Sequence, residues 1–128
     1  MMNKFITSFF LILLILSIQP KPLIAITREL PECVVVTHCV KKDFKVNNLD
    51  DAFKKAIRIV SNTPRTTIIE KTNSYIHAES KTKWRRYTDD FLLKAIPEKN
   101  IIQVRSESRV GTGDNGVNKK RVDTFAYR

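Results

Sequence analysis

Residues 48–64 read NLDDAFKKAIRIVSNTP, and the periodicity of the apolar residues changes where this stretch ends. Apolar side chains recur in it at intervals of three and four positions, as they do on a helix with one buried face. These side chains are Leu49, Ala52, Phe53, Ala56, Ile57 and Val60. Asn48 is a suitable N-cap, and Asn62 with Pro64 ends the pattern. The sequence therefore predicts a helix around Asp50–Ser61.

Beyond Pro64 the apolar period becomes two, which is typical of strands with one buried face. Four such runs follow one another, separated by short polar turns. They are Thr66–Thr72, Tyr75–Arg86, Thr88–Ile96 and Ile101–Val110. Consecutive strands joined in this way pair antiparallel.

A second helix is expected around Val117–Tyr127, where Val117, Val122 and Phe125 supply apolar residues. The pattern also allows a further short strand at Asp43–Val46. A helix, a run of strands and a final helix indicate the α+β class. We expect a four-stranded antiparallel sheet with two helices packed on one face.

The N-terminus has the pattern of a secretory signal peptide. A lysine at position 4 precedes residues 5–18, which are uncharged and largely apolar. This run is shorter than the roughly 20 apolar residues that a membrane-spanning helix needs. Ala25 is the best cleavage position, although an uncleaved N-terminal anchor is the alternative. The predicted divisions are a signal peptide at 1–25, a cysteine-pinned lead-in segment at 26–42 and one domain at 43–128. We expect the protein to be exported to a periplasm, a thylakoid lumen or the extracellular space.

The chain is basic, with a net charge of +10 that falls to +8 when residues 1–25 are removed. Such a charge suits contact with anionic lipid, polyanions or acidic partners, and it also suits plain solubility. The densest clusters are Lys83 with Arg85 and Arg86, and Lys119–Arg121. Aromatic residues interleave with the first cluster, but export argues against nucleic acid as a partner.

Cys33 and Cys39 are the two cysteines of the chain. Cysteines of exported proteins usually pair, and the intervening residues form a loop that a disulfide can close. Two free thiols, or a metal site with His38 and His77, are the alternatives. The spacing does not match paired zinc-ligand motifs, so we expect a disulfide and no metal.

All three glycines, Gly111, Gly113 and Gly116, lie in one segment after the last predicted strand. Their spacing is G-x-G-x-x-G, but the chain ends 12 residues later. A dinucleotide-binding motif requires a βαβ unit and an acidic residue about 20 positions on, so this interpretation is rejected. The sequence indicates no cofactor.

This segment resembles the signature of a family called domain of unknown function 1499. The matching residues are Ser106, Ser108, Arg109, Gly111, Asp114, Gly116, Asn118, Arg121 and Val122. Pro31, Cys33, Cys39 and Val40 match the spacing of the family's opening, and residues 86–90 resemble its aromatic segment ending in an Asp pair. Lys119 and Lys120 stand where the family has arginines. The resemblance brings no catalytic assignment.

The glycine segment suggests an anion site at the start of the second helix, where backbone N–H groups lack helical partners. Its predicted residues are Arg105, Arg109, Gly111, Gly113, Asp114, Gly116, Asn118 and Arg121, supported by Asp89, Asp90, Ser106 and Ser108. The alternative is structural: the arginines pair with Asp89, Asp90 or Asp114, and Asp114 caps the helix.

These observations favour a non-enzymatic exported module that binds an anionic small molecule, a lipid headgroup or an unidentified partner protein. The alternative is a small enzyme that uses Asp89 or Asp90 with His77 as acid and base. Ser106 and Ser108 lie in a strand context without the sharp turn that exposes a nucleophilic serine. No catalytic residue is therefore assigned.

Overall fold

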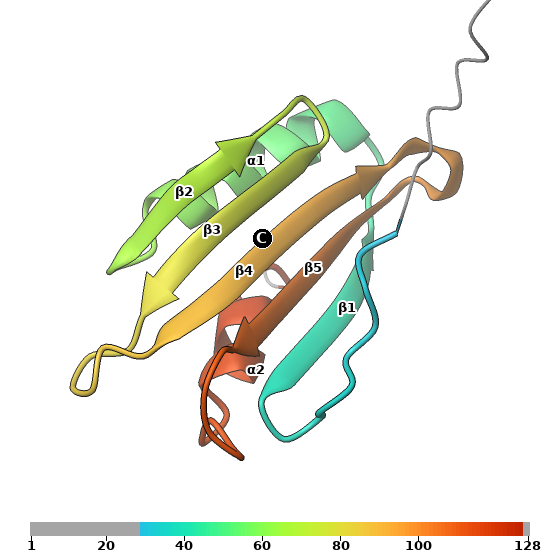
Figure 1. Ribbon diagram of the computed structural model, residues 1–128. Helices are drawn as coiled ribbons and strands as arrows, with labels where there is room; N and C mark the ends of the chain where they lie inside the picture. The colour runs from blue at the N-terminus through green and yellow to red at the C-terminus, as the bar shows by residue number, and fades with distance from the viewer. Residues whose placement is uncertain (1–28, 127–128) are drawn as a thin grey trace, which may run out of the picture.

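A single antiparallel sheet of five strands forms the centre of the protein in the computed structural model, which describes residues 29–126 (Figure 1). The strands are β1 (Cys39–Lys45), β2 (Thr66–Lys71), β3 (Tyr75–Lys81), β4 (Thr88–Ile96) and β5 (Ile101–Ser108). Their order across the sheet is β1-β5-β4-β3-β2, and every neighbouring pair is antiparallel. The last four strands thus form a meander, while β1 lies at the far edge beside β5.

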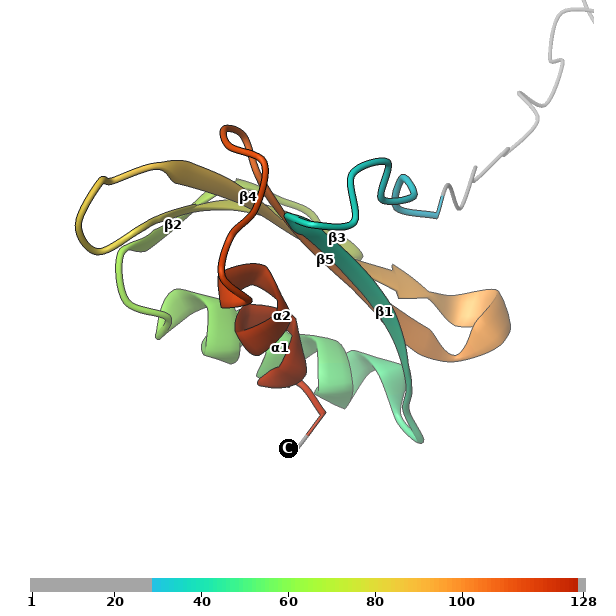
Figure 2. The ribbon, with the colours of Figure 1, turned by 90° about the horizontal axis from the view of Figure 1, so that it is seen from below.

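Two helices, α1 (Leu49–Ser61) and α2 (Val117–Asp123), lie on one face of the sheet (Figure 2). The predicted cap is present, since the Asn48 side chain accepts a hydrogen bond of 3.1 Å from the Asp51 backbone N–H. The core lies between these helices and the sheet. Its most completely buried apolar side chains are Val60, Ile76, Ala78, Phe91, Leu93, Val104 and Val122. The predicted α+β class is therefore confirmed.

The prediction of four strands is wrong by one, because β1 also belongs to the sheet. It begins at Cys39, inside the predicted lead-in at 26–42, and includes most of the short strand allowed at Asp43–Val46. Val40 lies opposite Ser106, and Phe44 lies opposite Ile102. Lys42 occupies the position between them on the same face and forms an ion pair with Asp123 of α2. This charged residue interrupts the apolar alternation that would have revealed the strand.

The other face of the sheet is partly covered by the segment that precedes β1. Leu30 is buried, and its backbone N–H donates to the Gln103 side chain on β5 at 2.8 Å. Cys33 and Cys39 form the predicted disulfide, which fixes this segment to the start of β1. Figure 1 shows the segment running beside β1.

One prediction lies wholly and another partly outside the described residues. The predicted signal peptide lies wholly among residues 1–28, and the predicted second helix extends to residue 127, whereas α2 ends at Asp123. Among residues 29–126, no helix is both long enough and apolar enough to cross a membrane.

Candidate functional site

The predicted site residues divide between the two faces of the sheet because side chains alternate along a strand. On β4, Asp89 faces the helices and Asp90 faces away, as their different partners show. On β5, Ser106 faces the helices and Arg105 does not. The consequence is two separate polar clusters.

The inner cluster lies between the sheet and α2 and consists of Asp89, Ser106, Ser108, Asn118 and Arg121. The Arg121 guanidinium donates to Asp89 Oδ2 at 3.0 Å, and to Ser106 Oγ and Asn118 Oδ1 at 2.8 Å each. It also lies over the Phe91 ring, 5.8 Å from its centroid. The side chains of Asp89 and Arg121 are 1% and 11% exposed, so this charge pair is almost fully removed from water.

Asn118 connects the inner cluster to the backbone around it. Its Nδ2 group donates to the His38 carbonyl at 3.0 Å and to Ser108 Oγ at 2.9 Å. Its Oδ1 accepts from Ser106 Oγ at 2.6 Å as well as from Arg121. One buried side chain therefore joins α2, the end of β5 and the residue before β1.

Asp114 occupies the start of α2. Its two carboxylate oxygens accept hydrogen bonds of 2.9 Å from the backbone N–H groups of Gly116 and Asn118. Burial raises the pKa of this carboxyl, but these backbone bonds outweigh burial and hold the pKa below its usual range. Gly116 has a φ of +77°, a conformation that favours glycine. Asp114 thus engages backbone donors that the predicted anion would have used.

The outer cluster consists of His77, Glu79, Asp90 and Arg109, on the face away from the helices. Arg109 donates to both oxygens of Asp90, at 2.8 Å from Nε and 2.7 Å from Nη2, and to Glu79 at 2.5 Å. His77 Nε2 lies 2.7 Å from Asp90 Oδ1. The hydrogen bonds from Arg109 lower the pKa of the Asp90 carboxyl. The Arg109 side chain is 43% exposed, so water reaches this cluster.

Three loops lie at one end of the molecule, the lower end in Figure 1, and we call this the three-loop end. They are residues 33–38 before β1, 82–87 between β3 and β4, and 109–117, which connect β5 to α2 and include Val117, the first residue of α2. The first and third loops are joined by hydrogen bonds from Thr37 to the Thr112 carbonyl and between His38 Nδ1 and the Gly111 carbonyl. Asn118 and the disulfide also hold the loop at 33–38, through a hydrogen bond to the His38 carbonyl and the bond between Cys33 and Cys39.

A hollow of about 570 Å³ separates the loop at 82–87 from the loop at 109–117. Apolar side chains of Trp84, Tyr87, Val110 and Val117 line it, together with Lys83, Arg85, Asp89 and Ser108. Asp89 is a member of the inner cluster, and its Oδ1 atom is buried without a hydrogen-bond partner. The inner cluster therefore adjoins the hollow through Asp89 and Ser108.

Residues 29–128 match the model of a family described as protein of unknown function, DUF1499. The chain belongs to this family. A comparison with curated proteins finds no match.

The three arginines of the predicted anion site have different partners in the structure of this DUF1499 domain. Arg121 belongs to the inner cluster and Arg109 to the outer cluster, while Arg105 pairs with Glu107 at 2.6 Å. The three arginines thus do not surround the glycine loop. The pairings of Arg121 with Asp89 and of Arg109 with Asp90, and the capping by Asp114, are those of the structural alternative. His77 and Asp90, paired in the enzyme alternative, do meet.

The structure adds site residues that the sequence-based prediction left out. Lys83, Trp84, Arg85 and Tyr87 lie across the hollow from the glycine loop of this DUF1499 domain. Their signal was visible as aromatic residues interleaved with a basic cluster, but that pattern was weighed only as a nucleic-acid site. Among residues 29–126, no three His, Cys, Asp or Glu side chains are grouped so that they could hold a metal ion.

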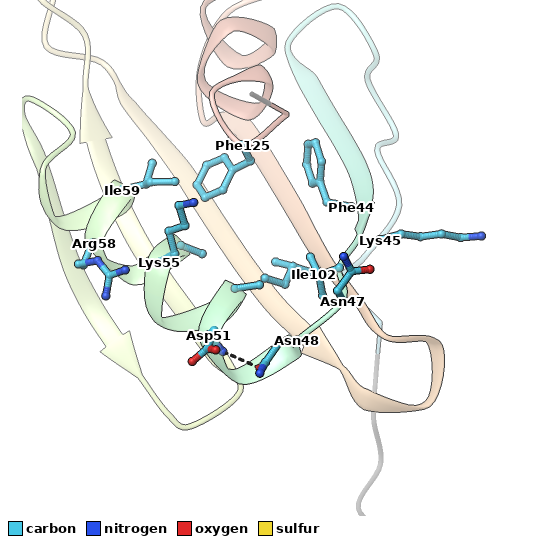
Figure 3. Close-up of a pocket in the computed structure, with 13 residues that line it drawn as sticks. Phe44, Lys45, Asn47, Asn48, Asp51, Lys55, Arg58, Ile59, Ile102 and Phe125 are labelled. Carbon is cyan, nitrogen blue, oxygen red and sulfur yellow. Dashed lines mark hydrogen bonds between the residues drawn. The ribbon is translucent and has the colours of Figure 1, made fainter. Parts of the chain in front are cut away.

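A second hollow, of about 500 Å³, lies on the helix side of the domain (Figure 3). Phe44 and Phe125, whose ring centroids are 6.3 Å apart, form one side, and α1 forms the other. Lys55 and Arg58 project from α1 at its margin. The predicted site residues do not line this hollow, so it is separate from the three-loop end.

Proposed function

We propose that this DUF1499 domain is a non-enzymatic module that docks on an anionic lipid surface through its three-loop end. One observation carries the proposal. Of the eight large apolar residues that are exposed in the described chain, seven lie on these three loops. They are Val34, Val35, Val36, Trp84, Tyr87, Val110 and Val117, whereas Ile69 lies on β2.

Three of these side chains are largely exposed to solvent. Val34, Val36 and Trp84 are 89%, 77% and 85% exposed. Single exposed apolar residues are normal on a protein surface, but a group gathered at one end marks a surface that another apolar phase covers. Tryptophan and tyrosine are favoured at the boundary between water and lipid, since their rings are apolar with a polar edge.

The charges beside these residues fit an anionic surface. The loop at 82–87 carries Lys83, Arg85 and Arg86 and no acidic residue. The Lys83 ammonium lies over the Trp84 ring, 5.1 Å from its centroid, so cation and aromatic ring are presented together. Each cation held near an anionic bilayer contributes about 1 kcal/mol of attraction. With a net charge of +10, the whole chain has the same sign.

Two features favour docking over catalysis. The Asp90 carboxylate of the enzyme alternative is engaged at both oxygens by Arg109 and contacts His77 as well. Two loops of the three-loop end, 33–38 and 109–117, are by contrast held by the disulfide and by Asn118, which gives their apolar residues a fixed base. A fixed base lowers the conformational entropy that binding would cost.

The test uses Trp84, the single tryptophan of the chain, as its own reporter. Vesicles of phosphatidylcholine mixed with phosphatidylglycerol should bind the protein in sedimentation and shift Trp84 emission to the blue. Vesicles of phosphatidylcholine alone should bind it much more weakly. Raising the salt concentration should weaken binding, because the cations are exposed and salt screens them.

Variants separate the three-loop end from the rest of the chain. Every variant keeps residues 1–28, so differences between variants report on the described domain. Trp84→Ala and the double variant Lys83→Ala, Arg85→Ala should each reduce binding about tenfold or more, in line with the loss of membrane-facing cations and an aromatic anchor. Ile69→Ala and Lys54→Ala are the matched controls and should bind like the parent. Unchanged Trp84 emission with anionic vesicles would contradict the proposal.

A further inference from the structure

Asp89 Oδ1 is one of two buried side-chain polar atoms in residues 29–126 that have no hydrogen-bond partner, the other being Arg105 Nε. Asp89 is completely buried as a residue, and its side chain is 1% exposed. Oδ2 accepts from Arg121, whereas Oδ1 accepts from no group of the protein. A buried acceptor without a donor costs free energy unless a bound group supplies the donor. Asp89 is one of the residues that line the hollow of the three-loop end, so a group bound there lies beside this residue.

The surroundings of Asp89 select a neutral donor. Arg121 already neutralises the carboxylate, and Lys83 and Arg85 line the same hollow. An ammonium ion placed there would meet two positive side chains and a carboxylate whose charge is already balanced. A hydroxyl group can donate to Oδ1 without adding charge.

The remaining walls of the hollow fit a small polyol. Trp84, Tyr87, Val110 and Val117 offer apolar contacts for C–H groups, and Ser108 lies beside Asp89 across the β4–β5 pairing. Its volume of about 570 Å³ is in the range of small-molecule pockets. Lys83 and Arg85 sit on the loop opposite the glycine segment, where they can contact a phosphate that lies at the mouth.

We propose that this hollow receives a hydroxyl-bearing headgroup of an anionic lipid, with a headgroup hydroxyl donating to Asp89 Oδ1. Lys83 and Arg85 then contact the lipid phosphate. This inference rests on the proposed function, since it names the headgroup that the three-loop end selects.

Two lipids of equal charge test the inference. Phosphatidylglycerol and phosphatidylethanol both carry a single negative charge at neutral pH, but the headgroup of phosphatidylethanol has no hydroxyl. The parent chain should bind phosphatidylglycerol vesicles about tenfold more tightly at equal mole fraction, which is the effect of one hydrogen bond to a charged group. Equal affinity for the two lipids would overturn the inference and leave the proposed docking intact. Failure to bind either lipid would overturn both.

Variants test whether Asp89 accepts the hydrogen bond from the headgroup hydroxyl. Asp89→Asn should reduce the preference for phosphatidylglycerol, because it replaces the charged acceptor with a neutral amide, whose hydrogen bond to a hydroxyl is weaker. Because this change also weakens the pair with Arg121, Val117→Phe provides a second route by narrowing the hollow from an exposed position. It should reduce the preference too, while Ile69→Phe, which adds the same ring outside the hollow, should retain it. An undiminished preference in folded Asp89→Asn or in Val117→Phe would overturn the inference.

Discussion

Asp89 and Asp90 are neighbours on β4, each binds an arginine, and yet they belong to regions with opposite properties. Asp89 and Arg121 are buried between the sheet and α2, where serine and asparagine side chains complete the cluster. Asp90 and Arg109 lie on the other face, where the arginine side chain is 43% exposed. The difference follows from the alternation of side chains along a strand, which sends adjacent carboxylates to opposite faces.

Two similar ion pairs in one fold should therefore differ in how much they contribute to stability. Removing one partner of a buried pair leaves the other charge without water or counter-charge, whereas water replaces the partner at a surface pair. The inner cluster also carries much of the family signature, including Ser106, Asn118 and Arg121. These residues join α2 to β5 and to the loop before β1.

The largest effect expected is that of Arg121→Ala. It leaves the Asp89 carboxylate buried beside Phe91 and should lower the free energy of unfolding by about 3–5 kcal/mol. Urea denaturation followed by circular dichroism measures this change. Arg121→Lys should be intermediate, since lysine keeps the charge but lacks the planar group that bonds three partners.

A smaller effect is expected for Arg109→Ala, the matched variant in the outer cluster. Its pair with Asp90 is partly exposed, so the loss should be less than about 1 kcal/mol. Urea denaturation followed by circular dichroism also measures the free energy of unfolding of this variant. If Arg109→Ala were as destabilising as Arg121→Ala, the division between a buried and a solvated cluster would be wrong.

The smallest effect concerns acid pH. Arg109 lowers the pKa of Asp90 beneath its ordinary value of 3.8, so the folded state binds this proton more weakly than the unfolded state. The stabilisation is complete above pH 3.8 and disappears as the pH falls through the lowered value. The melting temperature of Asp90→Asn should therefore lie below that of the parent at neutral pH and approach it under acid conditions. If the difference in melting temperature between the parent and Asp90→Asn stayed constant from neutral to acid pH, the lowered pKa of Asp90 would not contribute to stability.

The meander and both helices could be predicted from the sequence because apolar periodicity reports burial directly. The predicted strand Thr88–Ile96 matches β4 at both ends. β1 was largely missed because it is an edge strand whose middle position on the buried face is Lys42, which pairs with Asp123. A lysine that is neutralised by a residue far along the chain gives the same local pattern as a loop.

The candidate site was harder to predict because its residues are grouped by topology rather than by sequence spacing. The glycine segment did mark one wall of the hollow, but the cations across from it come from the β3–β4 loop. Arg105 and Arg109 stand near that segment in sequence, and the strand geometry places both on the other face. Only the order of the strands shows which loops share an end of the sheet.

The pairing of β1 with β5 also determines when the fold can close. Cys39 lies opposite Glu107, and Lys45 lies opposite Ile101. The first strand of the described chain therefore cannot pair until the last strand is present. During synthesis the ribosome releases β1 long before its partner exists, while β2 to β5 can pair with neighbours as they emerge. Contacts between such distant residues slow folding through the entropy of closing the intervening loop. The edge strand β1 can therefore join the sheet only after β5 has been made.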